Sequence, residues 1–214
     1  RGLGDVYKRQ GEHLFDAKLS AVIPGFDTRW LLEGKSECPG DVTFAGRRFL
    51  VYGHLVRASE RGGGFLATTY WVDVTELSAV RDRYQASRPV AAVLLLDNYE
   101  DAIKSLDESS RSLVLSEITR KFGQWSQDAK GVFCRLERDR YLFIFEQQYL
   151  DEFRAEKFAL LDQVRAIETP NHIPVTLSIG IGMDGDTLAD LYQFANLSVE
   201  MALSRGGDQV VLKN

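Results

Sequence analysis

The segment VAAVLLL, from Val90 to Leu96, is the longest uninterrupted aliphatic run of the chain. Pro89 precedes it and the polar pair Asp97-Asn98 follows it, so both of its ends are marked in the sequence. A continuous apolar run of this length is typical of a strand buried on both faces of a sheet. It is far shorter than the ~20 residues that cross a bilayer as a helix, so we expect the centre of a globular domain and no membrane span.

Periodicity downstream of this strand predicts further elements in a regular order. They are an amphipathic helix at 110–128, a hairpin of strands at 132–136 and 141–145, a helix at about 150–167, a strand at 175–182, a helix at 187–205 and a last strand at 209–213. With one short helix after the first strand, the order is β-α-α-β-β-α-β-α-β. This order predicts a mixed sheet covered by helices, in the α+β class, over residues 89–214.

The part of the chain before Pro89 has a different pattern, typical of a small antiparallel sheet. We expect strands at 42–44, 47–57 and 65–74, glycine-bearing turns at 45–46 and 61–64, and short helices and loops at 21–34. Asp73 and Thr75 can cap a following helix, which predicts a connector at 76–88. Residues 11–77 then form an α+β module. Residues 1–10 match no element, resemble a translated sequencing adapter and are set aside as a non-native leader, with the native protein beginning further upstream.

Composition limits the classes of protein that this chain can belong to. Its 214 residues are 44% hydrophobic and 27% charged, as in globular proteins. The net charge of -5 argues against a broad nucleic-acid-binding face. Cys38 and Cys134 are the only cysteines, lie far apart and have no CxxC partner, so neither a zinc site nor a disulfide framework is predicted.

Three stretches give the second part a resemblance to the GGDEF domains that make cyclic di-GMP. They are LLLDNY at 94–99, VTLSIGIG at 175–182 and the closing residues 202–211. The string RGGD at 205–208 looks like the signature itself, but it follows a long helix and precedes the last strand. We therefore interpret Gly206-Gly207 as a helix C-cap.

Placing the family's R-x-G-G-D-E-F signature on the predicted hairpin gives RLERDRY at 135–141. Glu137 and Arg138 then replace the two glycines that let a nucleotide approach the backbone. Asp139 keeps a carboxylate that can ligate a metal, whereas the family's second metal aspartate falls on Leu95, which has no oxygen to offer. The family's R-x-x-D product-inhibition motif falls on DAKG at 128–131 and is absent. We expect no diguanylate cyclase activity.

The first part resembles the C-terminal two-thirds of a PAS sensor domain, ending in the string DVTE at 73–76. A plain helix cap is the other interpretation of that string. PAS domains bind small ligands or haem inside the sheet, which implies Tyr52, His54 and Trp71 as pocket residues. An ordinary strand histidine is the alternative for His54.

The combination of the two parts is similar to the GdpP/YybT-type cyclic-di-AMP phosphodiesterases. That resemblance implies two N-terminal membrane helices, a PAS domain, a degenerate GGDEF domain and a DHH-type domain that hydrolyses cyclic di-AMP with manganese. This chain then corresponds to the regulatory middle, on the cytoplasmic side of the membrane, in a homodimer. Weak ATP hydrolysis in that family implies a nucleotide or metal site at Asp97, Asn98, Glu137 and Asp139, for which ordinary solvated acids are the alternative. The rival functions are an active diguanylate cyclase and a stand-alone haem or small-ligand sensor.

Overall fold

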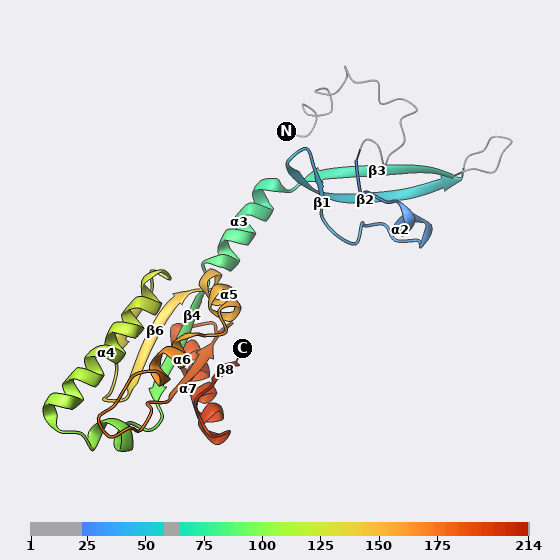
Figure 1. Cartoon of the computed structure of the whole chain (residues 1–214). Helices are drawn as coiled ribbons and strands as arrows, with labels where there is room; N and C mark the ends of the chain where they lie inside the picture. Colours follow the sequence, from blue (N-terminus) through green and yellow to red (C-terminus); the bar gives the residue numbers. More distant parts are fainter. Residues whose placement is uncertain (1–22, 58–64, 214) are drawn as a thin grey trace. The chain divides into compact units, whose positions relative to one another are not determined.

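The computed structural model describes residues 23–57 and 65–213 and divides the chain into two compact units, Arg1–Asp82 and Arg83–Asn214. Each unit has its own sheet (Figure 1). The predicted leader at 1–10, the start of the PAS-like module and the predicted turn at 61–64 lie outside the described residues.

The first unit is built on an antiparallel sheet in the order β1-β2-β3. The strands are β1 (Val42–Phe44), β2 (Arg47–Arg57) and β3 (Phe65–Asp73), as predicted. Ala45 and Gly46 join the first two strands with positive φ angles of 49° and 73°, the geometry of a tight hairpin turn. A short helix, α2 (Arg29–Leu32), packs Trp30 and Leu31 against one face of this sheet.

The helix α3 (Thr75–Ala86) begins where the DVTE string predicts a cap. The Asp73 carboxylate accepts hydrogen bonds from the Thr75 backbone N–H at 3.0 Å and from its hydroxyl at 2.6 Å. The Thr75 hydroxyl oxygen in turn accepts the Arg48 N–H at 2.9 Å, which fixes the start of the helix to β2. The division between the two units falls within α3.

The second unit contains a five-stranded sheet in the order β5-β6-β4-β7-β8, with β4 at its centre. The strands are β4 (Pro89–Leu96), β5 (Val132–Arg135), β6 (Arg140–Glu146), β7 (Leu177–Gly182) and β8 (Val210–Lys213). Only the β7–β8 pair among them is parallel. The prediction for 90–96 is confirmed, because each of these side chains is at most 8% exposed.

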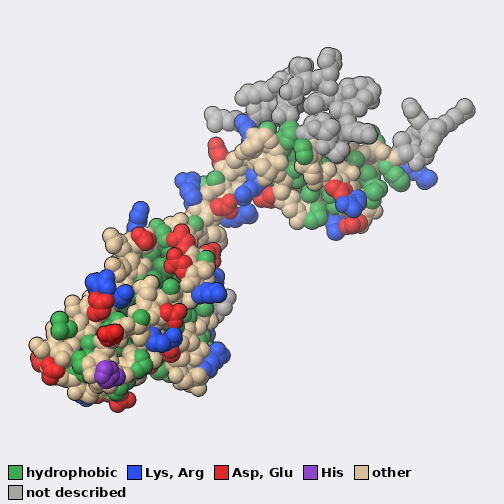
Figure 2. All heavy atoms as spheres, viewed as in Figure 1, with side chains coloured by type: hydrophobic (Ala, Val, Ile, Leu, Met, Phe, Trp, Pro, Cys, Tyr) green, Lys and Arg blue, Asp and Glu red, His purple; other side chains and the backbone are tan. Residues whose placement is uncertain are grey.

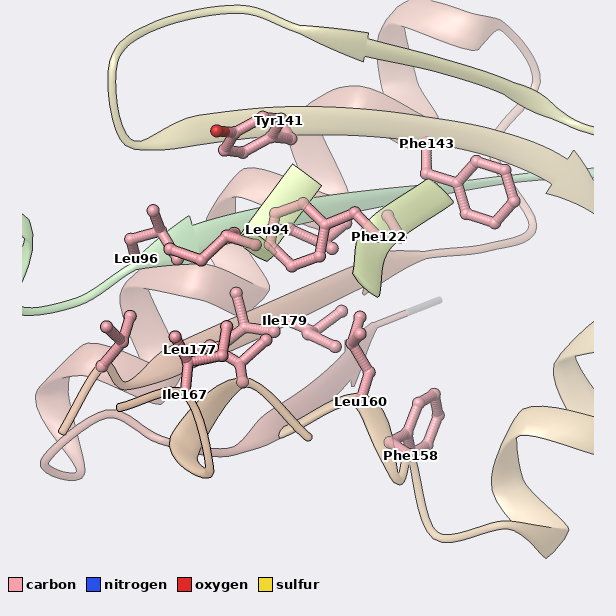
Figure 3. Packing of buried hydrophobic residues seen from close by; sticks show 14 of the residues in the cluster. Leu94, Leu96, Phe122, Tyr141, Phe143, Phe158, Leu160, Ile167, Leu177 and Ile179 are labelled. Atoms are coloured by element: carbon pink, nitrogen blue, oxygen red, sulfur yellow. The ribbon is translucent and has the colours of Figure 1, made fainter. Parts of the chain in front are cut away.

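Helices cover both faces of this sheet. On one face, Leu94 and Leu96 pack with α4 (Glu108–Gln127), α5 (Gln148–Ala155) and α6 (Leu160–Arg165), and Figure 3 shows Leu94, Phe122 and Ile179 within this core. On the other face, the alternate β4 residues pack on a single helix, α7 (Leu188–Ser204). Acidic and basic side chains are interspersed over the visible surface of the unit (Figure 2).

The helix predicted at about 150–167 is two helices, so the predicted order is wrong at this point. Lys157 and Phe158 separate α5 from α6 with φ angles of 53° and 52°, which end a helix. The Phe158 N–H donates to the Phe153 carbonyl at 2.8 Å, and the Phe158 ring is 8% exposed in the core. Burial of that ring offsets the strained backbone. The short helix after β4 is the π-helix η2 (Glu100–Lys104), and the order becomes β-α-α-β-β-α-α-β-α-β.

Within the ranges that the structure describes, no helix is both long and apolar enough to cross a membrane.

The glycines of VTLSIGIG explain how closely α7 packs on the sheet. A Cβ at Gly180 would lie 2.1 Å from the Ala195 carbonyl oxygen, and one at Gly182 would lie 2.1 Å from that of Leu191. The helix backbone therefore rests directly on the strand, and the Ser198 hydroxyl donates to the Ile181 carbonyl at 3.2 Å. Any larger side chain at either glycine pushes α7 off the sheet.

We predict that Gly180→Ala destabilises the protein by about 3 kcal/mol, because α7 must shift to accept the added methyl group. Urea unfolding of the full chain, followed by circular dichroism, measures this loss. Gly123→Ala is the matched control: Gly123 lies inside α4, and apart from the backbone of its own helix no atom lies within 4 Å of an added Cβ. That variant should gain about 0.5–1 kcal/mol from helix propensity. Equal stability of Gly180→Ala and the wild type would contradict the packing described here.

Candidate functional site

Asp97, the first polar residue after β4, connects three segments of the second unit. Its backbone N–H donates to the Thr176 carbonyl at 3.0 Å, just before β7. Its carboxylate oxygen Oδ2 accepts the Asp208 N–H at 2.8 Å, in the loop between α7 and β8. A Cβ at Gly207 would lie 2.9 Å from the same oxygen, so the glycine lets the loop approach the carboxylate.

Burial raises the pKa of the Asp97 carboxyl above its ordinary value. Hydrogen bonding by the Ser178 and Thr176 side chains and by the Asp208 N–H opposes this rise in pKa, whereas the negative charge of Asp208 adds to it. The net shift is upward, so these groups compensate the ionised form of Asp97 only in part.

The loop that meets Asp97 is itself fixed by the end of α7. Gly206 and Gly207 have φ angles of 103° and 74°, and the Gly207 N–H donates to the Ala202 carbonyl at 3.0 Å. The interpretation of these glycines as a helix C-cap is thus confirmed. Asp208 follows with a φ of 53°, and its Oδ2 accepts two bonds from Arg165 of α6, at 2.6 and 3.0 Å. Sequence reasoning missed this role of Asp208 and Arg165.

Asn98 uses its whole side-chain amide to hold the segment that enters β7. Its Nδ2 donates to the Pro174 carbonyl at 2.8 Å, and its Oδ1 accepts the Thr176 N–H at 3.1 Å. Both polar atoms of the Asn98 side chain are therefore bound to the backbone of this segment. Of the four residues predicted for a nucleotide or metal site, Asp97 and Asn98 both make structural hydrogen bonds.

Glu137 and Asp139 lie on the turn between β5 and β6. The Leu96 N–H donates to the Asp139 carbonyl at 2.9 Å, so this turn lies beside the end of β4. The Glu137 side chain is exposed, and that of Asp139 is partly buried. The structure thus brings the backbone of the turn next to the segment that carries Asp97 and Asn98.

Arginines of the hairpin close the turn on itself. Arg135 donates to the Glu137 carbonyl at 2.9 Å and to the Arg138 carbonyl at 2.5 Å. Arg138 reaches the other way, to Glu100 at 3.2 Å, with its guanidinium 5.7 Å from the centre of the Tyr99 ring. Arg140 donates to the Asn196 side chain of α7 at 2.9 Å. The recurrence of arginine in RLERDR was the available signal for these contacts.

The position at which the resemblance expects a second metal aspartate is apolar in its surroundings. Leu95 is 8% exposed and packs with Leu191, Ala195 and Val199 of α7. Across residues 23–57 and 65–213, three or more His, Cys, Asp or Glu side chains nowhere gather in a way that could hold a metal ion. Asp139 remains a candidate for a single carboxylate ligand.

The residues predicted for a PAS pocket lie on different faces of the first sheet. Trp71 pairs with Val51 and packs 4.9 Å from Phe26 between ring centres, on the face that α2 covers. Tyr52 and His54 alternate with Val51 and point to the opposite face, where His54 stacks on Tyr70 at 6.0 Å. The described residues therefore do not bring all three to one pocket. A hollow of about 660 Å³ lies beside α2, and its lining residues, which include Phe26, Trp30 and Cys38, contain none of the three.

We predict that the stability of the fold does not require the negative charge of Asp97 but does require the hydrogen bond that its side chain accepts from the Asp208 N–H. Asp97→Asn keeps an acceptor for the Asp208 N–H without a buried charge, so at neutral pH it should be at least as stable as the wild type. Asp97→Ala leaves that N–H unpaired and should lose about 1–3 kcal/mol.

The pH dependence of this comparison follows from the raised pKa. The contribution of wild-type Asp97 to stability is most favourable when the carboxyl is protonated and falls as pH rises through its folded pKa. The advantage of Asp97→Asn should therefore shrink in thermal unfolding measurements as pH is lowered from neutral toward the ordinary pKa of a carboxyl group. If Asp97→Asn loses as much stability as Asp97→Ala at pH 7, the negative charge is required and this account is wrong.

Comparisons with known proteins agree with the geometry of the second unit. The active GGEEF domain of a diguanylate cyclase from Vibrio cholerae superposes with a TM-score of 0.53 at 13% identity, over 64% of this chain and 90% of that one. The GGDEF domain of DgcB from Caulobacter crescentus gives 0.52 at 12% identity, over 64% of this chain and 84% of that one. These structural similarities show that the second unit has the fold of a GGDEF domain.

Proteins with similar sequences identify the family of this chain more specifically than the solved structures do. Cyclic-di-AMP phosphodiesterase PdeA of Listeria monocytogenes is 36% identical over 67% of the chain, and cyclic-di-AMP phosphodiesterase GdpP of Bacillus subtilis is 34% identical over 80%. The chain spans 22% and 25% of the lengths of these relatives. The family described as cyclic-di-AMP phosphodiesterase GdpP-like, GGDEF domain, matches residues 94–214, more than half of the chain. The chain therefore belongs to the GdpP-like family of cyclic-di-AMP phosphodiesterases, of which it contains the GGDEF domain.

Proposed function

We propose that this chain is the regulatory portion of a cyclic-di-AMP phosphodiesterase. In this proposal, residues 11–77 belong to a PAS-like sensor module, α3 is the connector, and residues 89–214 form a degenerate GGDEF domain. Hydrolysis of cyclic di-AMP takes place in a manganese-dependent DHH-type domain outside this sequence, in a homodimer on the cytoplasmic side of the membrane. Family membership and the names of the two curated relatives support this assignment.

The observation that carries the proposal is the closed hairpin turn. In an active cyclase of this fold, we expect an open glycine turn that a nucleotide can approach. Here the side chains of Glu137 and Arg138 project from the turn, and Arg135 occupies two of its carbonyl groups. Leu95 adds an apolar side chain where the second metal ligand is expected. Both features favour a domain that transmits a signal over one that condenses GTP.

A nucleotide-binding role for the same region is part of the proposal. Asp139 carries the carboxylate that we assign to a metal with ATP, since its backbone carbonyl accepts the Leu96 N–H at the end of β4 and its side chain is only partly buried. Glu137 lies on the same turn. Asp97 and Asn98 shape the site through the backbone contacts described above.

For the first unit we propose a small-ligand sensor. The haem alternative fits poorly, because His54 lies on the face opposite the apolar cluster of Trp30, Val51 and Trp71. The described neighbours of His54 on that face, such as Tyr52 and Tyr70, are exposed and do not enclose an axial ligand. The hollow beside α2 is a better candidate for a small ligand than a site that contains His54.

We predict that the full chain, incubated with GTP and Mg²⁺, yields no cyclic di-GMP by chromatography. We also predict that the intact gene product hydrolyses cyclic di-AMP in the presence of Mn²⁺ and that this chain alone does not. An active diguanylate cyclase assayed in parallel controls for the first measurement. Formation of cyclic di-GMP would support the cyclase alternative, and an intact product without cyclic-di-AMP hydrolysis would reject the phosphodiesterase assignment.

A further inference from the structure

A single exposed carboxylate, that of Glu100, neutralises two cations from separate elements. Lys104, one turn further along η2, donates to its Oε2. Arg138, on the hairpin turn, donates to its Oε1 at 3.2 Å, although the two residues are 38 positions apart in the sequence. Hydrogen bonding by Lys104, followed by the charges of Lys104 and Arg138, lowers the pKa of Glu100. Two cations therefore share one carboxylate at this point.

The backbone of the hairpin turn is held by hydrogen bonds, and the Arg138 side chain extends from it into solvent. Arg135 binds the carbonyls of Glu137 and Arg138, and the Leu136 N–H donates to the Arg140 carbonyl at 2.9 Å. The Arg138 side chain itself is 64% exposed. Beneath it lies the Tyr99 ring, whose residue is only 7% exposed and forms part of the core. The guanidinium of Arg138 is therefore accessible to a ligand from solvent, while the turn that carries it is hydrogen-bonded.

We propose that Lys104 and Arg138 form a phosphate-binding pair. In the free chain, the carboxylate of Glu100 occupies the position between them that a phosphate group would take. The ligand class is a polyphosphate, either the tail of a nucleoside triphosphate or inorganic polyphosphate. This inference rests on the nucleotide-binding part of the proposed function and assigns phosphate recognition to residues outside its four candidates.

Charge and geometry both favour this exchange. Exposed ion pairs hold weakly, and both partners of the Arg138–Glu100 pair are more than half exposed. A triphosphate carries several negative charges and can give oxygens to a guanidinium fork and an ammonium together. It therefore competes well with a single carboxylate. Glu137 and Asp139 flank Arg138 on the turn, and their negative charges keep the affinity low.

The test is isothermal titration calorimetry of the full chain at low ionic strength and without divalent metal. Inorganic tripolyphosphate and ATP are titrated separately. Glu100→Gln removes the internal competitor and should bind either ligand about three- to tenfold more tightly than the wild type. Arg138→Gln and Lys104→Gln should each weaken binding by a similar factor. Added NaCl should weaken binding to every variant that binds.

Glu117→Gln is the matched control, because Glu117 forms an exposed ion pair with Arg120 elsewhere, on α4. It should leave both affinities unchanged. Equal affinities for tripolyphosphate and ATP, with the stated order of variants, support a pure phosphate site; tighter ATP binding in the same order supports a site that also contacts the nucleoside. Wild-type affinity in Glu100→Gln, or no binding to it at all, overturns the inference. Neither of these two results bears on the phosphodiesterase assignment. Cyclic-di-AMP hydrolysis by the intact gene product tests that assignment separately.

Discussion

The direct contact of α7 with the glycines of β7 is the constraint on which the second unit depends. Because Gly180 and Gly182 have no side chain, the helix lies with its backbone against the strand. The helix ends at the Gly206-Gly207 cap, which turns the chain back toward the sheet. The loop delivers the Asp208 N–H to Asp97, and β8 adds beside β7 in parallel. A contact between one helix and one strand thus organises the end of the sheet where the candidate site lies.

The consequence for function is that polar residues at this end of the sheet stabilise the fold. Asp97 holds the loop after α7, and Asn98 holds the segment that enters β7. Arg135 and Arg140 fix the hairpin to itself and to α7. A domain of this kind can transmit a change in one segment to the others through shared hydrogen bonds. That property is consistent with the regulatory role proposed for this member of the GdpP-like family.

Sequence patterns were sufficient for elements whose burial depends on the local order of residues. The run at 90–96, the glycines of VTLSIGIG and the cap at 206–207 each have a local physical reason. The break at Phe158 was not predictable in the same way, because its strained backbone is offset by burial of the ring in a core assembled from distant segments. The contact of Arg138 with Glu100 likewise depends on the sheet bringing the hairpin turn to η2. Strand periodicity alone does not show that Trp71 lies on the opposite face of the sheet from Tyr52 and His54. That assignment also requires the pairing of Val51 with Trp71, which the structure shows.

Native-state hydrogen exchange of the full chain tests the central claim, that hydrogen bonds at the end of β4 form one cooperative unit with the sheet. The amides to follow are those of Leu96, Asp97, Thr176 and Asp208, with Ile179 of β7 as the internal reference. The account predicts that all four exchange with an opening free energy close to that of Ile179, because they open only when the unit unfolds. Rapid exchange of Asp208 and Thr176 while Ile179 stays protected would contradict it. In that case the polar end of the sheet opens independently, and Asp97 and Asn98 do not hold it together.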